Sequence, residues 1–161
     1  MSTQLVFGLL VLVALIGYQA AARYYHAHKT QEWWLKSKEA WVAGDLPAAT
    51  NALERCLKWA PLAVAPRVLL ATALARQGRL KEAEDHLRMA ADLQPKEASG
   101  YVELALFYAS ACTGRMADAA SALERALKCD PQVATQLLHD RRFDQLREVP
   151  ELKPMLTADT P

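Results

Sequence analysis

The N-terminal part of the chain carries a long, uninterrupted apolar stretch. Residues Leu5 to Ala22 contain no charged side chain, and Gln19 is the only strongly polar one. Eighteen helical residues span about 27 Å, close to the roughly 30 Å of a bilayer's hydrocarbon core. Tyrosines, which favour the headgroup region, cluster around the C-terminal end of the stretch: Tyr18, Tyr24 and Tyr25. The pattern predicts a transmembrane helix over residues 1–22.

The flanks of this stretch decide between an anchor and a cleaved signal peptide. Ala20 to Ala22 resembles a small-residue cleavage site, but residues Met1 to Gln4 carry no Lys or Arg, which a secretory signal normally has. An uncleaved anchor is therefore favoured. Basic residues follow the stretch and none precede it: Arg23, Lys29, Lys36 and Lys38. The positive-inside rule then places the C-terminal domain in the cytoplasm.

Beyond the apolar stretch, hydrophobic positions recur with a period of about one helical hairpin. Pro61, Pro95 and Pro131 each close an apolar helical run, at intervals of 34 and 36 residues. Within each unit a glycine is followed after five residues by an alanine, after four more by a leucine and after three more by a small residue. The three sets are Gly44, Ala49, Leu53 and Cys56; Gly78, Ala83, Leu87 and Ala90; and Gly114, Ala119, Leu123 and Ala126.

Each part of this pattern has a physical cause in a helical hairpin. Glycine adopts the left-handed conformation that ends one helix, and proline stops the next. Alanine lets two helices approach closely, and the leucine four residues on fills the space between them. The pattern predicts helices over 30–43, 47–59, 64–77, 80–93, 98–110 and 116–129. No Gly or Pro lies between Arg23 and Thr30, so the transmembrane helix is expected to continue into the first of these.

This pattern resembles the tetratricopeptide repeat, with its W-x2-L-G-x2-Y, A-x3-F and closing proline. The residues at the first-helix signature positions are Trp33, Leu35, Lys36, Ser37 and Ala40; Arg67, Leu70, Ala71 and Leu74; and Tyr101, Leu104, Ala105 and Tyr108. The third repeat is the best match and the first the poorest. The resemblance implies an all-α fold, in which a transmembrane helix precedes a helix-turn-helix solenoid of about three repeats. The third repeat carries two extra residues around Ala111 to Thr113, expected to lengthen its turn.

The expected organisation follows from these boundaries. A juxtamembrane stalk covers 23–29, and the repeats cover 30–63, 64–97 and 98–131. C-terminal capping helices are expected over 132–156, since a terminal repeat exposes an apolar face that must be covered. The expected capping side chains are Phe143, Leu146, Leu152 and Leu156. Residues 157–161 are expected to fray.

Composition and charge exclude several functions. Nineteen basic and 18 acidic residues give no nucleic-acid footprint. Three cysteines, Cys56, Cys112 and Cys129, have no C-x-x-C spacing and are interpreted as small apolar fillers in a reducing compartment. His26 and His28 are two residues apart, which points them in different directions on a helix. No phosphate loop, metal motif or catalytic constellation is recognised, so we expect no enzymatic activity, metal or cofactor.

The resemblance also implies a binding groove, lined by the first helix of each repeat. Its expected residues are Trp34, Lys38, Trp41, Val68, Thr72, Arg76, Val102, Leu106 and Ala109. Some relatives clamp a C-terminal carboxylate with Lys and Asn at such positions. Here Trp34, Val68 and Val102 stand there, which makes a carboxylate clamp an unfavourable interpretation. A mostly apolar groove suits an apolar or amphipathic protein segment.

The sequence therefore predicts a single-pass protein of the bacterial inner membrane that acts as a scaffold or adaptor. It binds a protein partner through the groove, in the assembly or organisation of a membrane complex. One alternative is a small accessory subunit of a membrane enzyme, held through its transmembrane helix. Another is a periplasmic scaffold, if the orientation is the reverse.

Overall fold

The structure is a computed structural model, which describes residues 3–112, 114–135, 144 and 150. Every regular element bounded in this part of the chain is a helix, labelled α1 to α6. The chain divides between Ala63 and Val64 into two compact units. This boundary is also the expected joint between the first and second repeats. The all-α fold expected from the sequence is confirmed.

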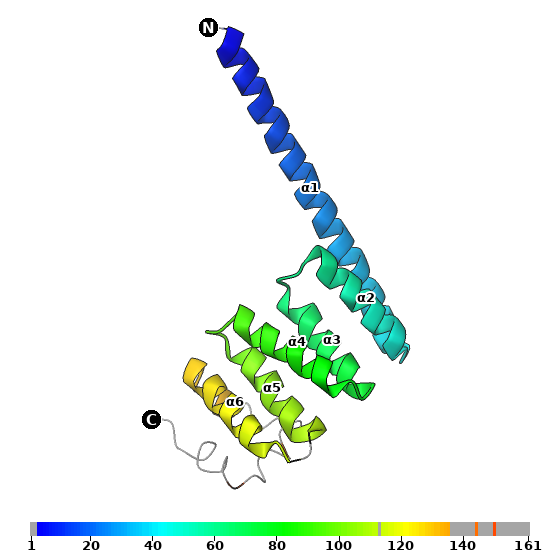
Figure 1. Cartoon of the computed structure of the whole chain (residues 1–161), viewed down its shortest axis with the longest axis vertical. Helices are drawn as coiled ribbons and strands as arrows, with labels where there is room; N and C mark the ends of the chain where they lie inside the picture. The colour runs from blue at the N-terminus through cyan, green and yellow to red at the C-terminus, as the bar shows by residue number, and fades with distance from the viewer. Residues whose placement is uncertain (1–2, 113, 136–143, 145–149, 151–161) are drawn as a thin grey trace. The chain divides into compact units, whose positions relative to one another are not determined.

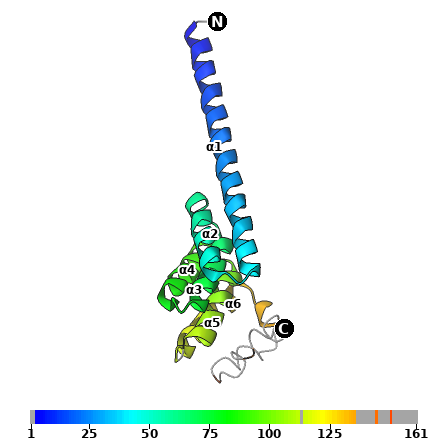
Figure 2. The same ribbon diagram turned by 90° about the vertical axis from the view of Figure 1, so that its right-hand side faces the viewer.

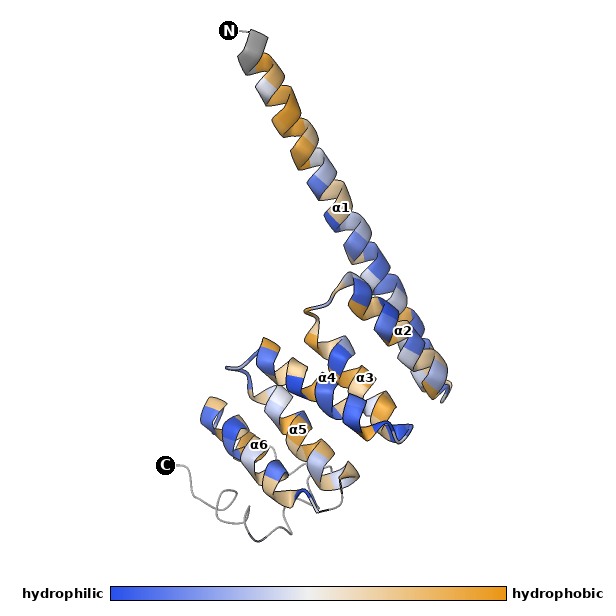
Figure 3. Cartoon of the chain, viewed as in Figure 1, coloured by the Kyte–Doolittle hydropathy of each residue, from blue (hydrophilic) through white to orange (hydrophobic). Residues whose placement is uncertain are grey.

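The first unit contains one very long helix, α1, which spans Thr3–Val42. It runs unbroken through Arg23 to Thr30, as the absence of Gly and Pro there predicts. Its N-terminal part is strongly hydrophobic and its C-terminal part alternates between polar and apolar residues (Figure 3). Among the described residues, α1 is the one helix that is long and apolar enough to cross a membrane. No residue in its most apolar segment is buried. Length and composition fit an anchor and a signal sequence equally.

The second helix of this unit, α2, spans Leu46–Trp59 and returns along the C-terminal part of α1 (Figure 1 and Figure 2). Gly44 makes the reversal with a φ of 75°, a left-handed conformation that favours glycine. Asp45 then caps α2, because its carboxylate accepts a hydrogen bond of 2.9 Å from the Ala48 amide. Cys56 is fully buried in this hairpin, and its thiol donates to the Thr30 carbonyl at 3.5 Å.

The second unit contains four helices: α3 (Val64–Arg76), α4 (Leu80–Leu93), α5 (Ala98–Ala111) and α6 (Met116–Cys129). They form two successive hairpins, α3–α4 and α5–α6, and α4 also packs against α5 (Figure 1). Gly78 and Gly114 make the two hairpin turns, with φ of 78° and 84°. The hairpin thus recurs through both units, as the sequence period predicts.

The core repeats in the same register. The three alanines that follow the turn glycines are 0% exposed, and the leucines four residues later are at most 4% exposed. The small residues three positions further on are also fully buried. The sequence pattern therefore identifies the side chains that close each hairpin.

The two extra residues of the third repeat do not both enter its turn. α5 has 14 residues where α3 has 13, so one of them lengthens the helix and the other lies between the helix and Gly114. The expected capping helices lie outside the described residues, as do Phe143, Leu146, Leu152 and Leu156. Val133 and Ala134, just after α6, are buried.

Candidate functional site

The expected groove residues of the second unit lie on two neighbouring first helices, α3 and α5. Val68, Thr72 and Arg76 are spaced by four residues, which places them along one face of α3. The Thr72 hydroxyl donates to the Val68 carbonyl at 3.0 Å, so its proton is used within α3 and its oxygen can only accept a hydrogen bond from a ligand. Arg76 is exposed, whereas Val68 and Thr72 are half-buried.

The α5 face has the same character. Val102, Leu106 and Ala109 follow one another by four and three residues, and all three are half-buried. Partial burial leaves part of each side chain within reach of another molecule. Of the six predicted positions on the two helices, four are apolar, and Arg76 is exposed at the end of α3.

A pocket of about 140 Å³ lies in this surface. Of the predicted residues, Thr72 and Leu106 line it, while the other four predicted positions on α3 and α5 do not. The remaining lining residues are Ala71, Ala75, Leu87, Glu103, Phe107, Ser110 and Ala111. The lining is mostly apolar, and Glu103 and Ser110 supply polar atoms beside Thr72.

The expected groove residues of the first unit lie near the end of α1. Trp34 and Trp41 are half-buried, and Lys38 is exposed. The Lys38 ammonium lies 5.0 Å from the centre of the Trp34 ring, which is within the range of a cation–π contact. Trp34 therefore presents an aromatic surface already paired with a positive charge.

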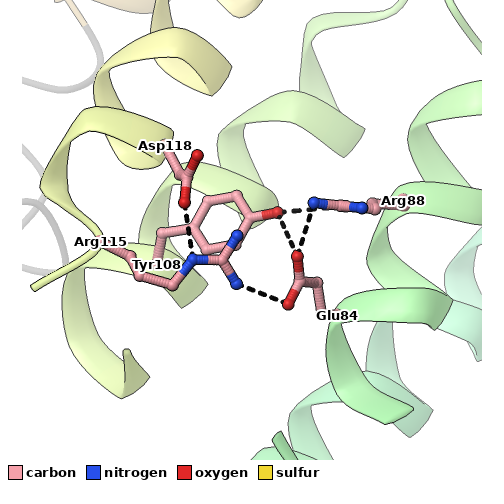
Figure 4. A network of polar contacts seen from close by, with 5 residues as sticks. All are labelled: Glu84, Arg88, Tyr108, Arg115 and Asp118. Atoms are coloured by element: carbon pink, nitrogen blue, oxygen red, sulfur yellow. Dashed lines mark hydrogen bonds and ion pairs between the residues drawn. The ribbon is translucent and has the colours of Figure 1, made fainter. Parts of the chain in front are cut away.

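Sequence reasoning did not anticipate a polar network that joins α4, α5 and α6 (Figure 4). At its centre is Glu84, whose side chain is only 15% exposed. One carboxylate oxygen accepts a hydrogen bond from the Tyr108 hydroxyl at 2.9 Å and an ion pair from Arg88 at 2.7 Å. The other oxygen pairs with Arg115 at 2.6 Å, and Arg115 also donates to Asp118 at 2.6 Å. The network ties the second hairpin to the third.

Its charges reinforce one another. The hydrogen bond from Arg115, aided by that from Tyr108, holds the pKa of Glu84 below its usual value of 4.5. Burial raises the pKa of Tyr108, so the hydroxyl stays protonated and able to donate. The guanidinium of Arg115 also lies over the Tyr108 ring, 4.4 Å from its centre. The charged and polar groups of the network bind one another, so we interpret it as a structural link between α4, α5 and α6.

Acidification is expected to reduce the stability that the Glu84 network provides. Because the pKa of Glu84 is lower in the folded than in the unfolded chain, its contribution is complete above pH 4.5 and is lost as the pH falls through the folded value. At pH 7, Glu84→Gln should reduce the free energy of unfolding by about 1–3 kcal/mol, the range for hydrogen bonds to charged groups. Thermal unfolding followed by circular dichroism, on the full chain in mild detergent, measures this.

The matched control is Glu124→Gln, which removes an exposed ion pair with Lys128 at 2.7 Å. Exposed pairs contribute little, so its melting temperature should stay close to that of the parent chain. The gap between Glu84→Gln and the parent chain should narrow below pH 4.5. A gap that is unchanged down to pH 3 would show that the ionised carboxylate is not what holds the helices together.

A larger pocket, of about 270 Å³, adjoins this network. Its lining mixes positive, negative and aromatic side chains, among them Arg88, Asp92, Tyr101, Asp118 and Arg125. The balanced charges give it no clear preference for an ionic ligand. Among the described residues, no group of three or more His, Cys, Asp and Glu side chains is placed to hold a metal ion.

Stacked helical hairpins with buried alanine and leucine at fixed positions define the class of protein: a helical repeat. The family model that matches is the tetratricopeptide repeat, over residues 40–106, from the end of α1 into α5. No curated protein matches the sequence. With the fold and the repeat register in agreement, residues 40–106 contain tetratricopeptide repeats. Such repeats are protein-interaction modules.

Solved structures with a similar fold include two repeat proteins. One is the TPR2B domain of yeast Sti1 in a pHsp70 complex, with 24% identity and a TM-score of 0.62, over 73% of this chain and 95% of that chain. The other is a mutant O-GlcNAc transferase of Thermobaculum terrenum, with 26% identity and a TM-score of 0.58. The match covers 70% of this chain but only 21% of the transferase, so this chain corresponds to a small part of that enzyme.

Proposed function

We propose that the chain is a membrane-anchored adaptor, which binds a protein partner through the first-helix face of its repeats. The observation that supports the binding role is the apolar depression between α3 and α5, which Thr72 and Leu106 line. It lies on the helices that the family uses for binding, and it has no catalytic arrangement around it. The repeats are accordingly proposed to have no enzymatic role.

The proposed partner is an apolar or amphipathic protein segment. The α3–α5 surface offers Val68, Val102 and Leu106 as half-buried contacts and a single exposed cation, Arg76. Such a surface gains its affinity from burial of apolar side chains, and aromatic residues such as Trp34 commonly dominate the binding energy. The TPR2B domain of Sti1 is seen in a pHsp70 complex, which supports a peptide-like ligand for the present repeats.

The proposed anchor is the N-terminal part of α1. Phe7, Leu10 and Ile16 are 71%, 63% and 59% exposed. Exposing so many large apolar side chains to water is unfavourable and is typical of a membrane or protein interaction site. A bilayer would cover them, and the basic residues that follow favour a cytoplasmic repeat domain on a bacterial inner membrane. The adaptor would then work beside the membrane, in the assembly or organisation of a membrane complex.

The groove is tested by a pull-down of the full chain in gentle detergent, read by mass spectrometry. Trp34→Ala/Leu106→Ala should lower the recovery of a stoichiometric partner by about tenfold or more, as expected when interface anchors are truncated. The control Leu35→Ala/Val42→Ala removes apolar groups at positions that are 50% and 88% exposed, outside the proposed groove. It should keep the partner.

Two other outcomes have distinct meanings. A partner that survives the Trp34/Leu106 change, but is lost when residues 1–22 are deleted, would replace the adaptor by a subunit held through its membrane helix. A deletion variant that stays in the membrane fraction would instead contradict the anchor.

A further inference from the structure

The first unit contains a pocket that the proposed groove does not use. It has a volume of about 450 Å³ and lies between α1 and the C-terminal part of α2. Five side chains line it, all of them basic or aromatic: Lys29, Trp33, Arg55, Lys58 and Trp59. Positive charge combined with indole rings is the chemistry of a site for an anion at an apolar boundary.

Two cations lie over the Trp33 ring, and one of them, Arg55, lines the pocket. The Arg55 guanidinium lies 4.7 Å from the centre of the ring, and the Lys36 ammonium lies 4.4 Å from it. Nε of Arg55 donates to Asn51 at 2.9 Å, which keeps the guanidinium in place and leaves its two amino groups for a ligand. This fixed fork suits the oxygen atoms of a phosphate.

The pocket also carries an excess of positive charge. Glu32 bridges Lys29 and Lys36, at 2.8 and 2.7 Å, and the hydrogen bonds from these two lysines lower the pKa of its carboxyl to about 2. Among the described residues, Glu32 is the only carboxylate within ion-pair distance of these lysines, of Arg55 or of Lys58. Of the three basic residues that line the pocket, only Lys29 is therefore paired with a carboxylate, and Lys58 is exposed at the end of α2.

The Trp59 end of the pocket is the end nearer the predicted membrane span, which indicates where an anion would come from. The Trp59 ring packs edge-on against Tyr25 and His26, with centroid distances of 5.5 and 5.1 Å. These residues follow the end of the apolar stretch, Ala22, by three and four positions, or about 5–6 Å along a helix. The headgroup layer extends roughly 5–8 Å beyond the hydrocarbon core. If the apolar stretch spans a bilayer, Trp59 lies at headgroup depth.

The neighbouring surface has the same interfacial character. Tyr24 is 75% exposed, and Leu62, in the loop that follows α2, is 73% exposed. Aromatic side chains prefer the boundary between headgroups and acyl chains, and Leu62, three residues after Trp59, would find apolar surroundings there.

We propose that this pocket binds the phosphate of an anionic phospholipid in the leaflet next to the repeat domain. Arg55 and Lys58 hold the phosphate, and Lys29 adds positive charge. Trp59, at the end nearer the membrane, contacts the glycerol region, while Trp33 packs against the Arg55 guanidinium. The inference rests on the proposed membrane anchor, and it gives the first repeat a lipid-binding role separate from the protein-binding groove.

The test uses the full chain in a mild neutral detergent, titrated with phosphatidylglycerol or phosphatidylcholine and read by native mass spectrometry. The parent chain should bind phosphatidylglycerol at least about tenfold more tightly. Each basic group near a lipid surface contributes about fivefold in affinity. Arg55→Gln/Lys58→Gln should therefore bind phosphatidylglycerol about 25-fold more weakly, which removes the preference. Equal binding of the two lipids by the parent chain would overturn the proposal.

The control is Lys81→Gln/Lys128→Gln, which removes the same charge from exposed positions on α4 and α6. It should keep the preference for phosphatidylglycerol, and its loss there would show a general charge effect instead of a pocket. Helix content by circular dichroism checks that the variants fold. If the double variant does not, Lys58→Gln alone changes one exposed side chain and should cost about fivefold.

Two further experiments distinguish a lipid phosphate from free phosphate, and the pocket proposal from the anchor proposal. Inorganic phosphate should not displace the lipid at millimolar concentration, and displacement would assign the pocket to a small soluble anion instead. Flotation with pure phosphatidylcholine vesicles tests the anchor without the pocket. Flotation without a preference for phosphatidylglycerol would leave the anchor standing and reject the pocket. A failure to float, with the preference intact, would reject the anchor alone.

Discussion

Replacing Leu123 by alanine is expected to lower the free energy of unfolding by about 2–5 kcal/mol. Leu123 lies in the middle of α6 and is completely buried, with Ala119 and Ala126 on the same helix face, also buried. These two buried neighbours are alanines, which are too small to refill the space that truncation leaves. The loss combines the transfer energy of the removed carbons with the cost of a cavity.

Thermal or urea unfolding of the full chain in mild detergent, followed by circular dichroism, measures this effect. The control is Val42→Ala, which truncates a side chain that is 88% exposed at the end of α1. A surface truncation of this kind usually changes stability by less than about 0.5 kcal/mol. A Leu123→Ala variant that melts with the control would mean that the hairpin core is not packed as the burial of its residues indicates.

The expectation for Leu123 comes from the repeat register, which was also the most predictable part of the fold. The residue types of Gly78, Ala83 and Leu87 recur at equivalent positions in each hairpin because each hairpin has the same packing requirements. A turn must reverse the chain, two helices must cross closely, and one large side chain must fill the gap. Local requirements of this kind appear in the sequence as fixed spacings, so helix positions and core residues could be predicted from them.

The sequence predicted which helix positions face the groove, but not which of them line a pocket. The family pattern selects Thr72 and Leu106 along with their neighbours, and these two line the α3–α5 pocket. It does not select Glu103 or Ser110, which supply the polar atoms of that pocket. Whether a residue at a given register position meets a depression depends on the side chains of the adjacent helix. That information is spread over two repeats and leaves no spacing of its own.

The Glu84 network could not be predicted for a related reason. Glu84 and Arg115 are 31 residues apart, and their ion pair of 2.6 Å depends on how one hairpin stacks on the next. Charged residues on the outer positions of helices normally indicate a solvated face. The basic pocket was missed in the same way, because Lys29 and Arg55 come together only when α2 folds back along α1.

Gly100 lies where α5 passes close to α4, and the sequence pattern gave no indication of this close approach. A glycine inside a helix ordinarily costs stability, by about 1 kcal/mol relative to alanine. Here α5 passes so close to α4 that a Cβ atom on Gly100 would lie 2.8 Å from Cα and 3.0 Å from the amide nitrogen of Ala91. Contacts with backbone atoms cannot be relieved by a side-chain rotation, so the two helices would have to separate. Gly100→Val should therefore cost about 1–3 kcal/mol, despite the better helix propensity of valine.

The control for Gly100→Val is Ser99→Val, one position earlier in the same turn of α5, where the side chain is exposed. The two variants add the same β-branched residue to the same helix end, so their difference in unfolding free energy isolates the close approach to α4. Adding Ala91→Gly removes only the 3.2 Å contact with the Ala91 Cβ atom and leaves the two shorter backbone contacts, so it should restore little of the loss. Full rescue by Ala91→Gly, or equal stability of the two valine variants, would show that α4 and α5 do not meet backbone to backbone. The joint between the second and third repeats would then depend mainly on the Glu84 network instead of on helix contact.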